Sequence, residues 1–421
     1  MYLISQVMFG ISLSVLLTYA VRQYLFMYTS LKHNSVPDEP NPKDLTHAVS
    51  ILIPAHNEDK VIGRTLEYMS KLDYPRDKIE VILLNDNSKD NTSNIAYEWA
   101  SICPFIRVID RPVGGLGKGD VLNQGIRESK NDIIFIFDAD YTPAPDTIKR
   151  LVRWFDDPKV GLVQGKIHVV NKDENLLTKM IHTERCAGFQ CDLLARDTLK
   201  VSNQYGGTAG GFRRELIAKV GEWQPGTYCE DTDLTCRAML AGYKVKYDVS
   251  VNCGEEAPDR LKIYYKQRYR WIRGHVLCAL KYSNQFFNSP YLSRREKVDG
   301  LLWLNLNCIP ILTVLATVIG TGITIHSILQ PNGLEQYILN LAEPLVFVPA
   351  ILLSVFGLGA TIGTVFAGLH NVKEIRYLKF AISMIINSYI MCFIISTKAY
   401  IDILINRPFK WIVTERNGVI T

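Results

Sequence analysis

The sequence predicts an α/β domain, with a parallel sheet covered by helices on both faces, joined to helices that cross a membrane. Between residues 49 and 137, short apolar runs alternate with helical patterns. Strands that alternate with helices of this length form parallel sheets. Between residues 300 and 405 the chain carries few charges, whereas its middle is charged throughout. A chain of 421 residues has room for two or three structural units.

Composition narrows the functional class. The net charge of +5 is modest and no basic run with interleaved aromatic residues occurs, so a nucleic-acid partner is not expected. The cysteines show no C-x-x-C pairing, which predicts reduced thiols in a cytosolic domain rather than disulfides or a zinc site. The nine cysteines are Cys103, Cys186, Cys191, Cys229, Cys236, Cys253, Cys278, Cys308 and Cys392.

An apolar run near the start of the chain predicts a membrane anchor. It extends over Ile4–Ala20 and is followed by Arg22. A secretory signal would have basic residues before the run and a small-residue cleavage site after it, and neither is present. We therefore expect an uncleaved anchor over residues 1–27, with Arg22 and Lys32 placing the next segment in the cytoplasm. A buried helix of a soluble protein is the alternative.

Prolines between Pro37 and Pro42 indicate an extended linker. Four predicted strands follow it, and ligands bind at the carboxyl ends of the strands in such sheets. The strands are Val49–Ile53 (ending at Pro54), Ile79–Leu84, Phe105–Ile109 and Asp132–Phe137. Polar clusters follow the first, second and fourth strands, at His56–Glu58, Asn85–Ser88 and Asp138–Asp140.

A glycine-rich stretch, Gly114–Asp120, resembles a phosphate-binding loop without being a Walker loop, because Gly119 follows Lys118 where Ser or Thr would stand. Its glycines would let the backbone approach a diphosphate, and Lys118 would supply positive charge near a helix N-terminus. A flexible turn that carries a solvated lysine is the alternative.

Asp138 and Asp140 predict a metal site. They lie two residues apart at the end of an apolar strand, so their side chains start on the same side of the pleat. Paired carboxylates suit Mg²⁺ or Mn²⁺, which keep their remaining positions for water and phosphate oxygens. A solvated turn is the alternative.

Three acids, Glu230, Asp231 and Asp233, open a predicted helix. Acids in a first turn are ordinary capping residues, and we expect at least one of the three to have that role. Clustered carboxylates also raise one another's pKa, which favours general-base duty for one of them.

Gln267, Arg270 and Trp271 fall at i, i+3 and i+4, on one face of a predicted helix, while Arg268 points aside. An indole suits stacking on a sugar ring and a guanidinium suits a diphosphate. An amphipathic helix whose basic residues meet lipid headgroups is the alternative, and the two are compatible.

Taken together, these stretches resemble the membrane-embedded glycosyltransferases of family 2, which include cellulose, chitin, hyaluronan and poly-N-acetylglucosamine synthases. Some passages, including Trp411–Arg416, look closer to plant mannan and xyloglucan-backbone synthases. The matching stretches span about 220 residues in the family's order: Ile53–Glu58, Asn85–Ser88, Lys118 with Asn123, Phe137–Asp140, Gln164–Gly165, Gly207–Arg214, Glu230–Asp231 and Gln267–Trp271.

The resemblance implies a GT-A fold and a role for each matching residue. Asp140 would hold the metal, Asp231 would be the general base beside Glu230, and Gly207 and Thr208 would flank the acceptor end. Cys229 departs from the family, whose members commonly have threonine there, which puts a threonine-dependent movement of this helix in doubt. A nucleotide-diphospho-sugar, expected to be a UDP-sugar, would be held by Asn57, Glu58, Asp86, Lys118, Asp138 and Arg213. Gln267, Arg268, Arg270 and Trp271 would surround its diphosphate and the acceptor.

Three apolar blocks close the chain, at Leu301–Leu329, Leu345–Leu369 and Tyr377–Ile405, and each is long enough to span a bilayer. If all three crossed, the basic tail after Ile405 would lie outside, whereas the resemblance places it inside near the active site. We therefore expect one block, the third, to lie partly in the membrane interface.

The sequence thus predicts an integral membrane protein with a cytosolic GT-A domain at 28–285 and interface and membrane helices at 286–421. We expect an inverting, metal-dependent glycosyltransferase that extends a β-linked polysaccharide processively and threads it through its own helices. A non-processive glycolipid synthase, with a lipid acceptor entering sideways, is the first alternative. A non-catalytic membrane scaffold or polymer channel is an alternative of another class. A soluble nucleotide-dependent dehydrogenase is weaker, because no G-x-G-x-x-G follows the first strand.

Overall fold

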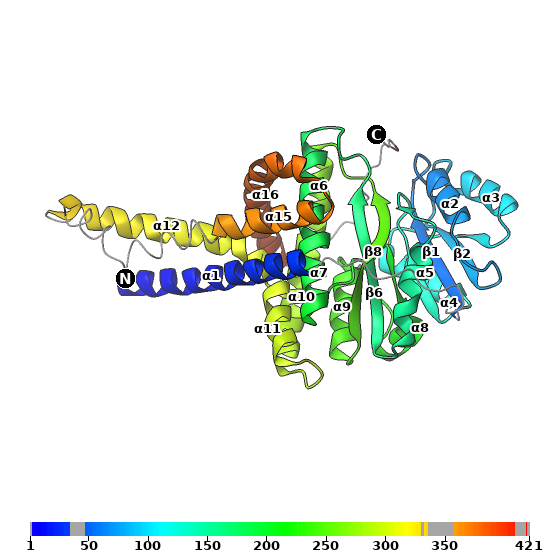
Figure 1. Cartoon of the computed structure of the whole chain (residues 1–421), viewed down its shortest axis with the longest axis horizontal. Helices are drawn as coiled ribbons and strands as arrows, with labels where there is room; N and C mark the ends of the chain where they lie inside the picture. Colours follow the sequence, from blue (N-terminus) through cyan, green and yellow to red (C-terminus); the bar gives the residue numbers. More distant parts are fainter. Residues whose placement is uncertain are drawn as a thin grey trace.

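The computed structural model describes residues 2–33, 47–224, 226–329, 332–335, 357–408 and 418. An α/β domain lies at one end of the molecule, and helices extend from it at the other (Figure 1). The expected linker at Pro37–Pro42, most of the segment 330–356 and the stretch Trp411–Arg416 lie outside the described residues.

A mixed eight-stranded sheet organises the α/β domain, in the order β3-β2-β1-β4-β7-β6-β8-β5. The first four strands are parallel, as the sequence predicts, whereas β7 runs antiparallel to both β4 and β6. The strands are β1 (Val49–Ala55), β2 (Ile79–Asn85), β3 (Ile106–Asp110), β4 (Ile133–Ile136), β5 (Thr142–Pro143), β6 (Val160–Val169), β7 (Gly210–Arg213) and β8 (Lys244–Glu255).

The predicted strand boundaries are close to those observed, with one informative difference. β1 continues through Pro54 to Ala55 instead of ending at Pro54. Proline has no N–H to donate to a ladder, which excludes it from strands paired on both sides. The pairing of β1 with β4 ends at Leu52, opposite Ile136, while its pairing with β2 continues to Ala55. Pro54 is therefore tolerated because the strand is paired on only one side there.

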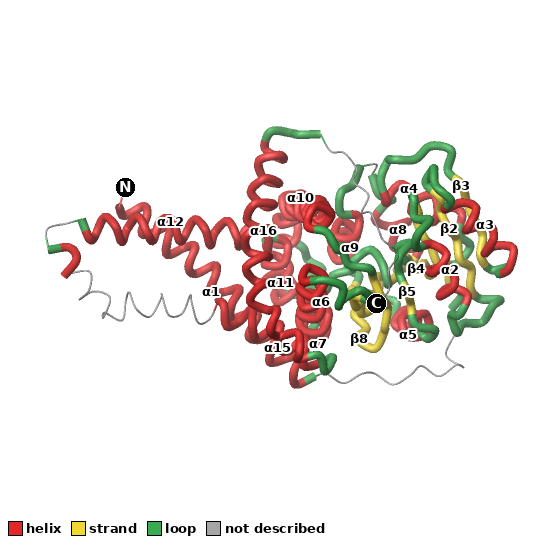
Figure 2. Tube along the Cα trace, turned by 90° about the horizontal axis from the view of Figure 1, so that it is seen from above, coloured by secondary structure: helices red, strands yellow, loops and turns green. Residues whose placement is uncertain are grey.

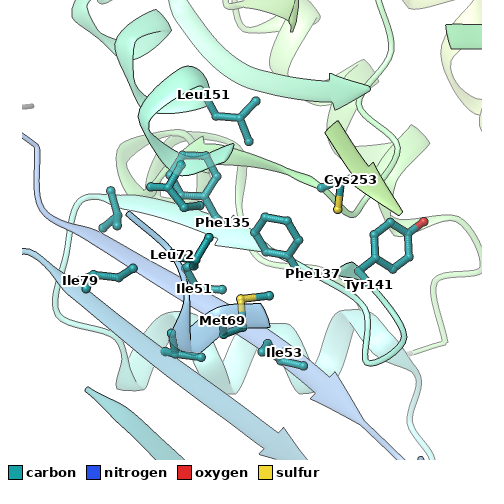
Figure 3. Close-up of a cluster of buried hydrophobic side chains, with 14 of the residues drawn as sticks. Ile51, Ile53, Met69, Leu72, Ile79, Phe135, Phe137, Tyr141, Leu151 and Cys253 are labelled. Carbon is teal, nitrogen blue, oxygen red and sulfur yellow. The ribbon is translucent and has the colours of Figure 1, made fainter. Parts of the chain in front are cut away.

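Helices cover both faces of the sheet, because alternate residues of each central strand point to opposite sides. Ile51 and Phe135 enter one hydrophobic cluster, which α2, α3 and α5 cover. Figure 3 shows this cluster, with Phe135 and Phe137 beside Ile51, Met69 and Leu72. Leu52 enters a second cluster, covered by α4, α8, α9 and α10. These helices are α2 (Ile62–Ser70), α3 (Thr92–Ile102), α4 (Lys118–Glu128), α5 (Thr147–Val152), α8 (Arg214–Val220), α9 (Glu230–Leu240) and α10 (Leu261–Asn288).

A layer of helices lies between the sheet and the projecting helices (Figures 1 and 2). Its members are α6 (Leu176–Ala187), α7 (Leu194–Leu199), α10 and α11 (Arg294–Leu304), with the π-helix Gly188–Leu193 joining α6 to α7. The apolar block predicted at Leu301–Leu329 is not one helix. α11 ends at Leu304, where the Asn305 side chain donates to the Leu301 carbonyl at 2.8 Å, and α12 (Ile309–Ile328) begins anew.

Three described helices are long and apolar enough to cross a membrane, at Val7–Lys32, Leu306–His326 and Ile375–Leu404. α1 (Tyr2–Lys32) and α12 extend side by side away from the α/β domain. α16 (Ala381–Leu404) instead lies across their direction, against α10 and α6 (Figure 2). α15 (Gly359–Asn371) packs against both α1 and α6.

Ion pairs fasten α1 to the rest of the molecule. The Arg22 guanidinium lies 2.7 Å from Asp299 of α11 and 3.4 Å from Asp192 of the π-helix. Arg196 contacts the same two carboxylates and lies 2.7 Å from Asp192 and 3.3 Å from Asp299. Arg22 and Asp299 are largely buried, so this network fixes the point at which the projecting helix meets the domain.

Candidate active site

The predicted site residues gather at the carboxyl ends of β1, β2 and β4. Asp86 follows β2 and is buried, with its carboxylate accepting from the Arg111 guanidinium and from the Gly115 N–H at 3.1 Å. Arg111 also pairs with Asp120. Gly115 and Gly117 have φ of 92° and 98°, so the glycine-rich loop needs residues without a Cβ to fold over Asp86.

Lys118, the first residue of α4, joins three parts of the site. Its ammonium lies 2.6 Å from Asp138 and 3.6 Å from Glu230, and it donates to the Gly207 carbonyl at 3.1 Å. Burial alone would lower the pKa of Lys118, but the charges of Asp138 and Glu230 outweigh it and raise that pKa above its ordinary value. Lys118 is therefore a fixed positive charge between two carboxylates.

The three acids that open α9 have different surroundings. Glu230 is buried, and burial raises the pKa of its carboxyl above the ordinary value; the Lys118 ammonium opposes this rise and Asp231 adds to it. Asp233 accepts from the Tyr282 hydroxyl at 2.6 Å and pairs with Arg237 at 2.8 Å. Asp233 is thus held by structural contacts.

Asp231 lies against the loop Gly206–Thr208. It is partly exposed, and its Oδ1 accepts from the Thr232 N–H at 2.7 Å. Gly207 adopts φ of 75°, and a Cβ added there would lie 3.0 Å from the Asp231 Cβ. Asp231 is thus partly exposed and lies beside Gly207, whereas Glu230 is buried and Asp233 is engaged by Tyr282 and Arg237.

Side-chain hydrogen bonds hold the loop Gly206–Thr208 in place. The Gln164 side chain on β6 accepts from the Gly206 N–H at 2.7 Å and donates to the Thr208 carbonyl at 3.1 Å. The Thr208 hydroxyl accepts from the Asp138 N–H at 3.0 Å. These bonds bring the loop, the Asp pair and the start of α9 into one site.

The Asp pair has the donors that a hard divalent cation needs. Asp138 is partly exposed and already attracts the Lys118 ammonium, whereas Asp140 is buried and accepts from the Glu256 N–H at 3.2 Å. β4 ends at Ile136, so both acids lie in the turn after the strand rather than on its pleat. Two carboxylates in a charged turn, one open to solvent, fit Mg²⁺ or Mn²⁺.

α10 presents the predicted Gln267–Trp271 face. Gln267 is buried, and Arg270, one turn further along the same helix face, is partly exposed. Arg268 makes a bidentate ion pair with Glu184 of α6, at 2.6 and 2.7 Å. The Arg268 and Arg185 guanidinium groups lie 5.0 and 5.3 Å from the Trp271 ring centre. Arg268 thus supports the indole and is not available to a diphosphate in this arrangement.

Asn57 and Glu58 lie at the rim, after β1. Asn57 is exposed with φ of 57°, and its Oδ1 accepts from the Lys89 N–H at 2.7 Å. The Glu58 N–H donates to Thr92 at 2.8 Å.

The structure does not bring Arg213 into this site. β7 runs antiparallel to β4, so Arg213 pairs with Ile133, at the amino end of the parallel strands. Its guanidinium donates to the carbonyls of Phe155, Asp157 and Val160. Its prediction as a nucleotide-binding residue is wrong, because the sequence does not reveal the direction of so short a strand.

Sequence reasoning also missed three supporting residues, Arg111, Glu184 and Arg185. Arg111 follows β3 just before the glycine-rich loop, and its position beside that loop was the available signal. Glu184 and Arg185 lie on α6, about 80 residues before the residues they hold, and no local motif marks them.

The comparisons with known proteins agree with this geometry. Residues 47–274 match the family described as glycosyltransferase like family 2. The chain therefore belongs to family 2 of the glycosyltransferases, and it is an enzyme of that class. Its α/β domain has the GT-A-like fold, with a curled mixed sheet. This confirms the predicted fold class.

Named relatives show how the family varies. The chain is 35% identical to a probable glycosyltransferase of Bacillus subtilis, over 70% of this chain and 72% of the relative. It is 30% identical to a beta-monoglucosyldiacylglycerol synthase of Synechocystis (60% and 52% covered) and 28% identical to a poly-beta-1,6-N-acetyl-D-glucosamine synthase of Staphylococcus aureus (62% and 63%). A mannosyltransferase of Pyrobaculum calidifontis, solved with GDP-Man and Mn²⁺, shares the fold with TM-score 0.59 and 21% identity, covering 91% of this chain and 97% of that one.

Proposed function

We propose that this protein transfers a hexosyl residue, with inversion, from a nucleotide-diphospho-sugar to a hydroxyl group presented at a membrane surface. One observation carries the proposal: Lys118 lies between Asp138 and Glu230 and donates to the Gly207 carbonyl, and Gly207 lies against Asp231. A positive charge where a diphosphate leaves and a carboxylate where a hydroxyl attacks are the two requirements of such a transfer.

Each residue then has a distinct role. Asp86 and the glycine-rich loop hold the nucleotide, and Lys118 with Arg270 faces the negative charge that develops on the leaving diphosphate. Asp231 accepts the proton of the acceptor hydroxyl. Mg²⁺ or Mn²⁺ bound by Asp138 and Asp140 would neutralise the diphosphate and favour its departure. Trp271, supported by Arg185 and Arg268, offers a ring on which a sugar can stack.

The acceptor we propose first is the end of a growing β-linked polysaccharide, with UDP as the donor nucleotide and the product passing through the membrane helices. The partly exposed Trp271 and the similarity to the poly-beta-1,6-N-acetyl-D-glucosamine synthase support it. The resemblance to plant mannan and xyloglucan-backbone synthases stays a prediction.

A specific observation favours a glycolipid acceptor as the second candidate. A cavity of about 450 Å³ lies between α1, α12, α15 and α16, lined mostly by apolar side chains such as Leu13, Leu17, Ile309 and Ile386. Its volume lies within the range of about 300–1,000 Å³ that is usual for ligand pockets. Hydrocarbon would fit such a lining better than hydrated sugar.

The decisive experiment measures nucleotide release from a panel of UDP- and GDP-sugars by the detergent-solubilised enzyme, with a membrane lipid extract and, separately, with oligosaccharides as acceptors. The products are then sized and partitioned between organic and aqueous phases. A ladder of long water-soluble chains supports the polysaccharide, and a single sugar on an extractable lipid supports the second candidate. Asp231→Asn is the matched inactive control. Failure of every donor to release nucleotide above this control would refute the proposed transfer.

A further inference from the structure

Three side chains of types that can bind a metal lie together where α6 packs against α15 and the segment that follows it. His182 and Cys186 belong to α6, and Glu374 lies between α15 and the 3-10 helix Ile375–Phe380. The His182 Nε2 atom lies 2.5 Å from a Glu374 oxygen and 3.6 Å from the Cys186 Sγ. All three ligand atoms lie within 4.8 Å of one another, and the two α6 residues are buried.

Local structure holds these side chains in position. His182 and Cys186 are four residues apart, so they share one face of α6. The His182 ring packs edge-on against Tyr377, with 4.7 Å between ring centres. Cys186 enters the hydrophobic cluster that Val365, Leu369 and Tyr377 form with it. The ligands therefore come from two elements that are far apart in sequence and already packed against each other.

We infer that His182, Cys186 and Glu374 bind Zn²⁺, with water in the fourth position, as a structural site separate from the Asp138–Asp140 site. Thiolate, imidazole and carboxylate together suit zinc rather than Mg²⁺ or Mn²⁺, which prefer oxygen alone. Tetrahedral zinc places sulfur and nitrogen ligands about 3.6 Å apart, the spacing seen between Sγ and Nε2. The His182–Glu374 hydrogen bond would lengthen to about 3.4 Å as the ion enters.

The charges around the site are compatible with zinc. One thiolate and one carboxylate balance the ion. The Nε2 atom of His182 faces Glu374, so the ring proton stands on Nδ1 when Nε2 binds the ion. The Cys186 S–H proton leaves to solvent as the S–Zn bond forms. Lys172, which pairs with the other Glu374 oxygen, is partly exposed and can turn to water.

The site would act on the transferase through α6. Glu184 and Arg185, between the two zinc ligands in sequence, hold Arg268 and Trp271 of α10. Zinc would fix α6 to the segment that precedes α16, and thereby order the face proposed to bind the acceptor. This consequence rests on the proposed function, whereas the binding of zinc does not. His182, Cys186 and Glu374 are positioning residues.

Cobalt substitution tests the inference without measuring activity. The full chain, purified in detergent and stripped with chelator, is titrated with Co²⁺ while the sulfur-to-cobalt charge-transfer absorption is recorded. We expect one equivalent to give this absorption and Zn²⁺ to displace it. The Cys186→Ser variant separates this signal from Co²⁺ bound at the Asp pair, near which the buried Cys253 lies. Cys186→Ser should abolish the absorption. Cys191→Ser is the control and should retain it, because Cys191 is also buried but its Sγ accepts a hydrogen bond from Ser30 and is not one of the proposed ligands.

Cys186→Ser changes a buried side chain and could fail to fold, so Glu374→Gln, at a more exposed side chain, serves as a second variant. It should weaken Zn²⁺ binding at least about tenfold. Absence of the absorption in the unmodified chain, or its persistence in Cys186→Ser, would overturn the inference. Loss of transfer with the absorption intact would instead count against the proposed function. If zinc orders the acceptor face, removing it should raise the acceptor KM while donor KM stays unchanged, and equal changes in both would overturn the positioning role.

Discussion

Lys118 and the acids around it decide the chemistry at the residue scale. The Lys118 ammonium offsets part of the negative charge of Asp138 and Glu230 before a donor binds. A diphosphate brings negative charge that Lys118 alone does not balance, and the proposed cation on the Asp pair would supply the rest.

Asp140→Asn therefore tests the metal. The amide keeps the size of the side chain and can still accept from the Glu256 N–H, so the fold should survive. Turnover should fall by at least about a hundredfold because the leaving diphosphate loses its charge partner. The measurement is nucleotide release with and without EDTA, followed by addition of Mn²⁺ or Mg²⁺. Asp77→Asn, at an exposed position, is the control. Full activity in EDTA would show that the transfer needs no metal.

Asp231→Asn tests whether Asp231, rather than Glu230 or Asp233, is the general base. Adjacent residues of a helix point about 100° apart, so Glu230 and Asp231 do not face one hydroxyl together. The variant should bind donor normally, while transfer falls by about 10²–10⁴-fold. Asp233→Asn, whose carboxylate is engaged by Tyr282 and Arg237, should change stability rather than the rate of transfer. If Asp231→Asn transfers at full rate and Glu230→Gln does not, Glu230 is the base.

At the scale of elements, α6 holds the part of α10 that we propose as the acceptor face, through the pair of Glu184 with Arg268. Glu184→Gln removes the ionic partner of Arg268, which is largely buried. Because Glu184 itself is about one-third exposed, we expect a loss of about 1–3 kcal/mol in unfolding free energy rather than the full cost of a buried pair. The acceptor KM should rise several-fold and the donor KM should not. Thermal unfolding and initial rates measure these effects.

Glu67→Gln, which breaks an exposed pair with Lys71 on α2, is the control and should leave stability and both KM values unchanged. Equal stability of Glu184→Gln and the unmodified chain would show that solvent replaces the carboxylate. In that case α6 would not order the acceptor face.

The parts of the site that the sequence predicted are those read from local patterns. Lys118 and Asp231 stand at helix starts that their own neighbours define, and the Asp pair follows an apolar strand. Arg213 was misplaced because a four-residue strand carries no mark of its direction. The support that Glu184 gives to Arg268 depends on how two distant helices pack, which no local pattern encodes.

At the scale of the whole molecule, the direction of α16 explains how a chain with three apolar blocks keeps its tail beside the catalytic domain. α16 lies across α1 and α12 rather than along them (Figure 2). Its Asp402 is buried and accepts from the Tyr269 hydroxyl of α10 at 2.5 Å. Further along, the Gly418 N–H donates to Glu256 at 3.1 Å, at the edge of the α/β domain. These contacts support an interfacial position for the third block, which stays a prediction.

Cysteine labelling across the membrane tests this position. If α16 lies in the interface, its end at Leu404 stays on the side of the α/β domain, whereas a crossing helix would carry it to the opposite side. Leu404, Glu335 beyond α12 and Ile102 of α3 are all exposed, so single cysteines there should react with an impermeant maleimide from the side on which they lie.

We expect Glu335→Cys to be labelled in intact cells, and Ile102→Cys only in inverted vesicles, which would place the catalytic domain in the cytosol. Leu404→Cys should behave like Ile102→Cys. The native cysteines set the background, and the buried majority among them should keep it low. Labelling of Leu404→Cys from outside would make α16 a true span. The tail contacts at Glu256 would then have to form by another route, and the interfacial assignment would be abandoned.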